Sequence, residues 1–112
     1  MKKLEIIIKP EKLESLKNIL DDCEASGLMI TNIMGYGNQK GVLKKYRGTQ
    51  YNANLLPKLK IETVVTDEIS EKLITDIVDQ IHTGNYGDGK IFISDVEDAV
   101  RIRTGEHGTE AL

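Results

Sequence analysis

Alternating apolar and polar residues predict four β-strands in this 112-residue chain. In the first of them Leu4, Ile6 and Ile8 share one face while Ile7 points to the other, which is the two-residue period of a strand. Pro57 is expected to precede the third strand, in which the alternation is strict. The four predicted strands are Lys3–Lys9, Leu28–Gly37, Leu59–Thr66 and Lys90–Val96.

Two further segments carry apolar residues at the spacing of amphipathic helices. The first begins at Pro10, whose missing N–H is harmless at a first helical position, and Gly27 is placed to end it. Its apolar positions are Leu13, Leu16, Ile19, Leu20 and Cys23. The second can be capped by Thr66 or Asp67. It is expected to bury Ile69, Leu73, Ile74, Ile77, Val78 and Ile81.

The order of these elements, β-α-β-β-α-β, predicts an α+β domain of the ferredoxin-like plan. A four-stranded antiparallel sheet would carry both helices on one face, and residues 1–112 would form a single domain. The other sheet face would then be bare, although the segments LEIII and KIFI are apolar on both sides. We therefore expect another copy of the chain to cover that face in an oligomer.

The region between the second and third predicted strands has an unusual charge. Residues 37–60 include no acidic residue and six basic ones, although the whole chain carries a net charge of −3. The apolar residues of this region lack the spacing of a helix or strand, and long irregular loops in small domains are usually functional or disordered. A positive loop on an acidic body predicts an anion site or a contact surface. The basic residues are Lys40, Lys44, Lys45, Arg47, Lys58 and Lys60.

Composition argues against several classes of protein. No apolar run approaches the roughly 18 residues of a membrane span, and the charged N-terminus does not resemble a signal peptide. The single Cys23 allows no internal disulfide, which favours a cytoplasmic location. His82 and His107 lack the spacing of a metal site, so zinc is not expected. A pI of about 5.4 and a single Phe argue against direct binding of nucleic acid.

Three glycine-bearing segments are candidates for binding phosphate. Residues 35–41, GYGNQKG, have the wrong spacing for a dinucleotide-binding fingerprint and lead into a loop, so they form either an anion nest or a hinge. Residues 84–91, GNYGDGKI, lack the Ser or Thr of a Walker A motif and follow a helix instead of a strand. They form either a turn that phosphate can approach closely or an ordinary glycine turn.

The third segment is Arg101–Gly105, RIRTG. If it is extended, Arg101 and Arg103 project to the same side about 7 Å apart, a spacing suited to a polyphosphate. The alternative is two solvated surface arginines. Because all three segments adjoin the ends of predicted strands, together they favour a nucleotide-phosphate site between elements.

Six motifs together resemble one known family. They are IIIKPEKLE, GYGNQKG, KKYRGTQY, LLPKLKIE, TGNYGDGKIFIS and VRIRTGE, and they extend over essentially the whole chain. The chain is similar to the PII signal-transduction proteins of nitrogen regulation. The resemblance implies a homotrimer of ferredoxin-like subunits that binds ATP or ADP in each cleft between neighbours and senses 2-oxoglutarate. It also implies a T-loop at about 37–55, a nucleotide-binding turn at about 82–90 and a C-terminal tail at about 97–112.

The resemblance assigns residues to these ligands. Lys90 would bind phosphate, and Arg101 and Arg103 would reach phosphates from the adjacent subunit. Lys58 would pair with the distal carboxylate of 2-oxoglutarate, and Gln39 would ligate a magnesium ion held by ATP and 2-oxoglutarate. The full implied set is Gly35, Gly37, Gln39, Lys40, Gly41, Lys58, Glu62, Val64, Gly87, Asp88, Gly89, Lys90, Arg101 and Arg103.

The implied partners are proteins of nitrogen metabolism: an ammonium transporter, glutamine synthetase, and nitrogenase-related or transcriptional regulators. Arg47 matches an arginine that plugs an ammonium channel, and Tyr51 matches a tyrosine that is nucleotidylated in many members. Membrane contact would arise only through a transporter. Thr49 matches a position that is a phosphorylated serine in some members. The sequence departs from the usual pattern at Asn38 and Met29, which leaves the strength of the phosphate and adenine contacts open. Lys44 and Lys45 also depart from it, so the choice of partner stays open.

Two other functions compete with a non-catalytic sensor. A slow nucleotidase would use the same phosphate site, with Glu62, which would otherwise orient groups of that site, as the base. A structural trimer would have lost its ligands, but the intact Gln39, Lys58, Lys90, Arg101 and Arg103 argue against this. We expect a signalling protein and not an enzyme.

Overall fold

The computed structural model describes residues 1–36, 43–46, 49–52 and 55–112. Its strands and α-helices are β1 (Lys2–Ile8), α1 (Leu13–Asp22), β2 (Met29–Tyr36), β3 (Leu43–Tyr46), β4 (Thr49–Asn52), β5 (Leu55–Val65), α2 (Asp67–Ile81) and β6 (Lys90–Asp95). Short 3-10 helices occupy Pro10–Lys12 and Gly108–Ala111. For β3 and β4 only the backbone pairing is described.

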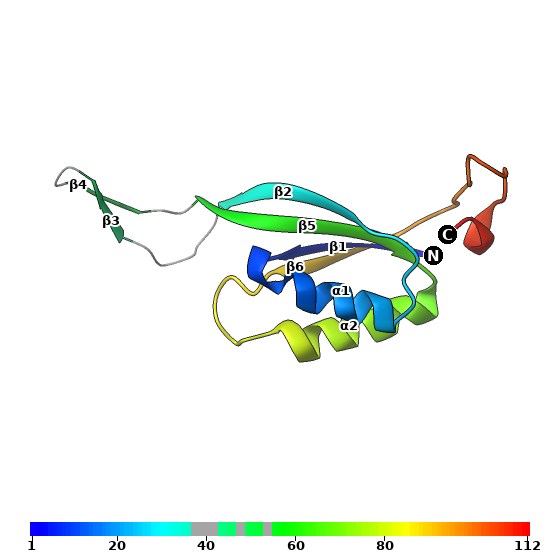
Figure 1. The fold of residues 1–112 in the computed structure, drawn as a ribbon, viewed down its shortest axis with the longest axis horizontal. Helices are drawn as coiled ribbons and strands as arrows, with labels where there is room; N and C mark the ends of the chain where they lie inside the picture. Colours follow the sequence, from blue (N-terminus) through cyan, green and yellow to red (C-terminus); the bar gives the residue numbers. More distant parts are fainter. Residues whose placement is uncertain (37–42, 47–48, 53–54) are drawn as a thin grey trace.

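Four strands form one antiparallel sheet in the order β2-β5-β1-β6. β1 lies between β5 and β6, with Ile6 opposite Ile61 on one side and Ile91 on the other. Both α-helices cover the same face of this sheet and contact each other (Figure 1). The predicted ferredoxin-like plan is therefore confirmed.

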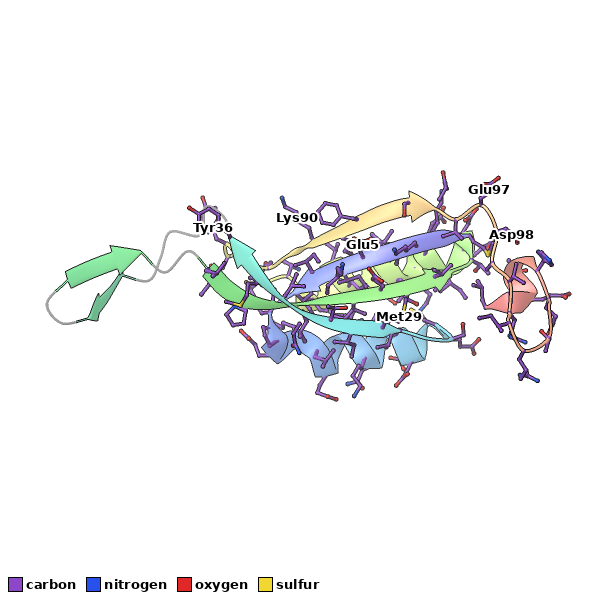
Figure 2. All side chains as sticks on the ribbon, turned by 90° about the horizontal axis from the view of Figure 1, so that it is seen from above. Glu5, Met29, Tyr36, Lys90, Glu97 and Asp98 are labelled. Carbon is purple, nitrogen blue, oxygen red and sulfur yellow. The ribbon has the colours of Figure 1, made fainter. Side chains whose placement is uncertain are left out.

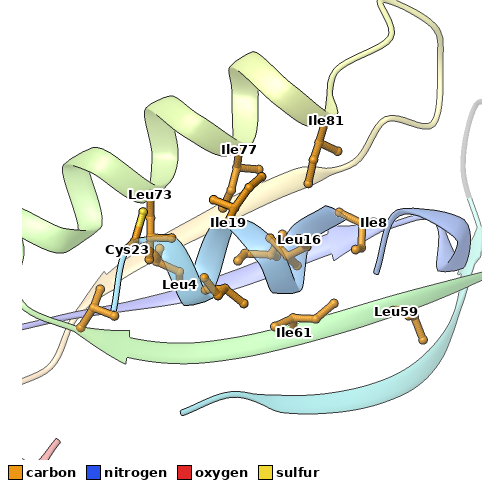
Figure 3. Close-up of a cluster of buried hydrophobic side chains, with 13 residues drawn as sticks. Leu4, Ile8, Leu16, Ile19, Cys23, Leu59, Ile61, Leu73, Ile77 and Ile81 are labelled. Atoms are coloured by element: carbon orange, nitrogen blue, oxygen red, sulfur yellow. The ribbon is translucent and has the colours of Figure 1, made fainter. Parts of the chain in front are cut away.

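The core fills the space between the sheet and the helices (Figure 3). Every second residue of β1 and β5 points into it, as the alternation in the sequence predicted. The prediction that Val78 is buried is wrong. Val78 is 56% exposed, because it lies at the margin of the buried stripe of α2, where it lines a cavity together with Ile91 and Ile93 of β6. The core consists of Leu4, Ile6, Ile8, Leu16, Ile19, Leu20, Cys23, Leu59, Ile61, Val65, Leu73, Ile77 and Ile81.

The strand β5 starts earlier than predicted, at Leu55 instead of Leu59, and it includes Pro57. Proline has no N–H to donate, so it is tolerated in a strand only where one side needs no donor. β1 ends opposite Leu59, and residues 55–58 of β5 therefore pair with β2 alone. The early start of β5 also brings Lys58 into the sheet, next to the end of β2.

The region predicted to be irregular contains a short antiparallel hairpin, β3–β4. Lys44 lies opposite Tyr51, and Tyr46 lies opposite Thr49. Tyrosine and threonine favour strands, but no apolar alternation accompanies them here, so hydrophobic spacing did not reveal the hairpin. The prediction of a segment without strands is corrected by this pairing.

In the described part of the chain, no helix covers the second face of the sheet, which Figure 2 shows from above. Its centre is charged: Lys3 contacts Glu5 at 3.3 Å and Glu62 at 3.8 Å, and Lys60 contacts Glu62 at 3.5 Å. Exposed apolar side chains lie instead on the two outer strands. Met29 on β2 and Phe92 on β6 share the charged face, since they lie opposite Glu62 and Glu5. Ile30 and Met34 on β2 and Ile93 on β6 are exposed on the side of the sheet that carries the helices.

Candidate anion-binding site

A cavity of about 670 Å³ opens at the end of the sheet where β2 stops and β6 starts. The turn between α2 and β6 contributes Gly87 and Gly89, while Gly35 and Lys58 line the cavity from β2 and β5. Lys90 and Tyr36 lie at this end of the molecule (Figure 2). Apolar surface comes from Ile7, Tyr36, Tyr86 and Phe92.

Asp88 organises the turn from within. Its carboxylate accepts hydrogen bonds from the backbone N–H of Thr83 at 2.7 Å, from the N–H of Gly84 at 3.0 Å and from the Thr83 hydroxyl. These bonds, led by that of the Thr83 hydroxyl, lower the pKa of the Asp88 carboxyl from 3.8 to about 2. Asp88 therefore remains charged at neutral pH and holds the turn closed.

Gly89 is required by its contact with β1. Its φ of +109° is one that residues with a side chain rarely adopt. A Cβ at this position would lie 1.8 Å from the carbonyl oxygen of Ile7. The turn can pass this close to the sheet only because residue 89 has no side chain.

Lys58 is the most informative residue of the cavity. Its side chain is only 9% exposed, and its Nζ donates a hydrogen bond to the Gly87 carbonyl oxygen at 3.0 Å. None of the ion pairs among the described residues involves Lys58. The residues outside the described ranges include no Asp or Glu. A buried ammonium group without a carboxylate partner favours an anionic ligand.

Lys90 adds a second positive charge. It is the first residue of β6, lies opposite Ile7 and has an exposed side chain. Two ammonium groups and a glycine-rich backbone, which allows close approach, suit phosphate or carboxylate oxygens. The structure thus brings together Gly35, Lys58, Gly87, Asp88, Gly89 and Lys90, six of the predicted ligand-binding residues.

Glu62 and Val64 do not reach this cavity within one chain. Both are half-buried residues of β5, and neither lines the cavity. Glu62 is engaged by Lys3 and Lys60 at 3.8 and 3.5 Å. It lies four residues along β5 from Lys58, which is about 13 Å at the rise of a strand.

The tail after β6, which contains both arginines, lies at the other end of the molecule (Figure 1). The extended geometry predicted for them is wrong, because the Gly105 N–H donates to the Arg101 carbonyl oxygen at 2.7 Å and closes a turn. Arg101 donates through Nη1 to Glu106 at 3.1 Å and through Nη2 to the Leu112 carbonyl oxygen at 3.0 Å. The Arg103 side chain is exposed.

Several predicted residues lie outside the described residues. These are Gly37, Gln39, Lys40, Gly41 and Arg47. Tyr51 lies in β4, where only its backbone pairing with Lys44 is described. The magnesium, modification and partner-contact assignments of Gln39, Tyr51 and Arg47 therefore stay predictions.

Sequence reasoning missed the apolar lining of the cavity. Ile7 had a signal, since it was placed on the face of β1 opposite the core. Tyr36 and Tyr86 also had one, because each directly adjoins a glycine of the candidate segments. Thr83, which holds Asp88, had no signal that spacing could provide.

Comparison with known proteins places these features in a family. A family model described as Nitrogen regulatory protein P-II matches residues 1–106. The chain belongs to this family. It is 49% identical to Nitrogen regulatory protein P-II 2 of Methanothermobacter thermautotrophicus, over all of this chain and 97% of that relative. It is 47% and 48% identical to the P-II proteins of Haemophilus influenzae and Azospirillum brasilense, over the full length of both chains.

The suspected membership in the P-II family is confirmed by these matches. Because its relatives are named as regulatory proteins, this P-II chain acts in nitrogen-regulation signalling and is not an enzyme, as predicted. Within the described residues, no helix is long and apolar enough to cross a bilayer. The same residues contain no cluster of three side chains suited to a metal ion.

Proposed function

We propose that this P-II protein senses ATP or ADP together with 2-oxoglutarate and passes their levels to targets in nitrogen metabolism. The observation that carries the proposal is the buried Lys58 without a carboxylate partner, in a cavity that it shares with a glycine turn and Lys90. The glycine turn suits a phosphate chain, and Lys58 suits the distal carboxylate of 2-oxoglutarate.

A single chain supplies only part of this nucleotide site. Lys90 starts β6, whereas Arg101 and Arg103 follow its end, and the strand between them spans about 17 Å. We therefore place the arginines of a neighbouring subunit at the cavity of this one. The exposed apolar residues of β2 and β6 support a ring in which one outer strand faces the other, and a homotrimer closes such a ring.

Magnesium would be bound largely by the ligands themselves. Since the described residues hold no metal-binding cluster, its oxygen ligands would come from ATP phosphates, 2-oxoglutarate and the amide of Gln39. A neutral amide oxygen completes the shell without adding charge repulsion against the phosphates. The bound ion would bridge nucleotide and effector.

The basic region around the β3–β4 hairpin is the proposed contact surface for partners. Arg47 would contact an ammonium transporter, and Tyr51 would be a modification site. Glutamine synthetase and nitrogenase-related or transcriptional regulators are further candidate targets. A cytoplasmic location agrees with the single Cys23, which allows no internal disulfide.

Calorimetry tests the proposal directly. 2-Oxoglutarate should bind tightly only with magnesium ATP present, and it should tighten ATP by the same factor. Gln39→Ala should abolish both enhancements while ATP still binds through Lys90, Arg101 and Arg103. Gln50→Ala, the same change at a residue with no assigned role, should keep them. Equal binding of 2-oxoglutarate without ATP would refute the bridge.

The slow nucleotidase is not favoured. Its proposed base, Glu62, contacts two lysines and does not line the cavity. Incubation with magnesium ATP should therefore give no turnover above that of a Glu62→Gln variant. Turnover by the wild-type chain that this substitution removes would support the nucleotidase hypothesis instead.

A further inference from the structure

The hydrogen bond from Lys58 to the turn gives this lysine a second role. We propose that Lys58 is a positioning residue: it fixes the Gly87–Asp88 peptide so that the Asp88 N–H is presented to a phosphate. This role is separate from any contact of Lys58 with a carboxylate. It rests on the proposed nucleotide site, and it extends that site by assigning the orientation of its backbone to a buried side chain.

The geometry of a trans peptide connects the two groups. The carbonyl oxygen of Gly87 and the N–H of Asp88 belong to one planar unit and point in opposite directions. Lys58 Nζ holds the carbonyl oxygen at 3.0 Å, so the Asp88 N–H points away from Lys58. No described residue accepts a hydrogen bond from this N–H, which leaves it as a donor for a ligand.

The peptide needs such an anchor because glycine does not impose one. Gly87 has a φ of +91° and, without a Cβ, tolerates backbone orientations that other residues resist. The start of the turn is held by Asp88 through Thr83 and Gly84, and its end is held by the close contact of Gly89 with Ile7. Lys58 supplies the third anchor, between these two.

Gly35 makes room for this anchor. A Cβ built on Gly35 would lie 3.2 Å from Lys58 Cγ, which is tighter than an ordinary contact. The side chain of Lys58 therefore passes Gly35 on its way from β5 to the turn. Gly35 has no side chain that could contact the turn. Its substitution should nevertheless disturb the turn, because it would displace the side chain of Lys58.

This arrangement also links the two proposed ligands. An ammonium group has three N–H donors, of which the Gly87 carbonyl takes one. A carboxylate bound to the others would restrain the same side chain that orients the turn. Part of the coupling between effector and nucleotide would then run through Lys58 itself, without the metal ion.

The experiment compares Lys58→Met with Lys60→Met, without effector and magnesium. Both substitutions remove one positive charge from β5, but Lys60 contacts Glu62 and not the turn. Lys58→Met should change the carbonyl carbon shift of Gly87 in NMR spectra and weaken ADP binding roughly 10-fold. Lys60→Met should leave that shift in place and alter ADP affinity far less.

Measurements in high salt distinguish an effect of Lys58 on the orientation of the peptide from simple charge attraction of the nucleotide. In about 1 M salt the Debye length is about 3 Å. A loss of ADP affinity caused by a distant charge should then disappear, whereas a loss caused by a misoriented peptide should persist. Gly35→Ala is the second variant, because it keeps the charge of Lys58 but displaces its stem. It should also shift the Gly87 carbonyl signal and weaken the binding of ADP.

Two results would overturn the proposal. One is an unchanged Gly87 carbonyl shift in both folded variants, and the other is a Lys58→Met defect that vanishes in high salt. A wild-type chain that binds no ADP would refute the nucleotide site instead. In that case the carbonyl shift would still decide whether Lys58 holds the peptide.

Discussion

At the scale of single residues, the shape of the cavity depends on positions where close contacts limit which side chain fits. The carbonyl oxygen of Ile7 leaves no room for a side chain at residue 89, and a Cβ at residue 35 would press against the stem of Lys58. Lys58 in turn is buried because its ammonium group reaches the Gly87 carbonyl. These contacts connect β1, β2, β5 and the turn around the cavity, so small substitutions here should have large effects.

Gly89→Ala should strongly destabilise the protein. The new Cβ would overlap the Ile7 carbonyl oxygen, and the φ of +109° adds strain for alanine. We expect a loss of at least about 2 kcal/mol in the free energy of unfolding. Urea denaturation at a fixed protein concentration measures it, because the stability of the proposed trimer would depend on concentration.

Gly27→Ala is the matched control. No atom lies within 4 Å of a Cβ built there, so the free energy of unfolding should change by no more than about 0.5 kcal/mol. Similar losses for the two variants would mean that the close approach of Gly89 to β1 does not hold in solution.

At the scale of elements, the parts that bury an apolar stripe were the ones that spacing predicted. β1, α2 and β6 each appear within one residue of the predicted position, since burial against one core requires that pattern. The start of β5 and the β3–β4 hairpin depend on backbone pairing instead, and Pro57 pointed away from a strand. The tail depends on turn contacts of Gly105, which spacing does not encode.

The candidate site divides in the same way. The glycines, Lys58 and Lys90 were found through motifs, and the turn does gather them around one cavity. Their orientation follows from hydrogen bonds between residues such as Thr83 and Asp88, whose types alone predict no contact. The separation of Lys90 from the arginines follows from the length of β6.

The turn should respond to acid through Asp88. Because the pKa of Asp88 in the folded protein is about 2, below its ordinary 3.8, this carboxylate stabilises the fold above pH 3.8. That contribution should be lost as the pH falls from 3.8 towards 2. A titration followed by the carboxyl carbon signal of Asp88 should give a midpoint of about 2.

Thr83→Val supplies the control for this titration. It removes the hydroxyl donor, the largest cause of the shift, and keeps the backbone N–H of residue 83. The Asp88 midpoint should rise towards 3.8 without reaching it. A wild-type midpoint already at 3.8 would show that the Thr83–Asp88 contact does not form in solution.

At the scale of the whole molecule, a single chain exposes two apolar edges and keeps the predicted ligand-binding residues at opposite ends. Its sheet ends in two outer strands, β2 and β6, which both expose apolar side chains. The cavity lies at one end of the sheet, whereas the tail with Arg101 and Arg103 lies at the other (Figure 1). An arrangement in which β2 of one copy meets β6 of the next would cover the strands and complete the site together.

Sedimentation should therefore give a mass three times the 12.5 kDa of the chain. Phe92 and Ile93 are 54% and 51% exposed in the single chain, so replacing Ile93 by Glu should weaken assembly by placing a charge in the contact. Gln80→Glu is the control, because it adds the same charge at an exposed position of α2, outside the two outer strands. A stable wild-type monomer at micromolar concentration would contradict the ring.

Mixing two defective chains tests whether the site is shared between subunits. Lys90→Ala impairs the turn, and Arg103→Ala impairs the tail, so each homogeneous trimer should bind ATP and ADP weakly, by roughly 10- to 150-fold for the arginine. In a mixed trimer, the intact turn of one chain meets the intact tail of another at one interface. Refolding the two variants together should therefore restore one tight site per mixed trimer, as counted by calorimetry. If the turn and tail of the same chain formed the site, every site would carry one defect, and mixing would restore nothing.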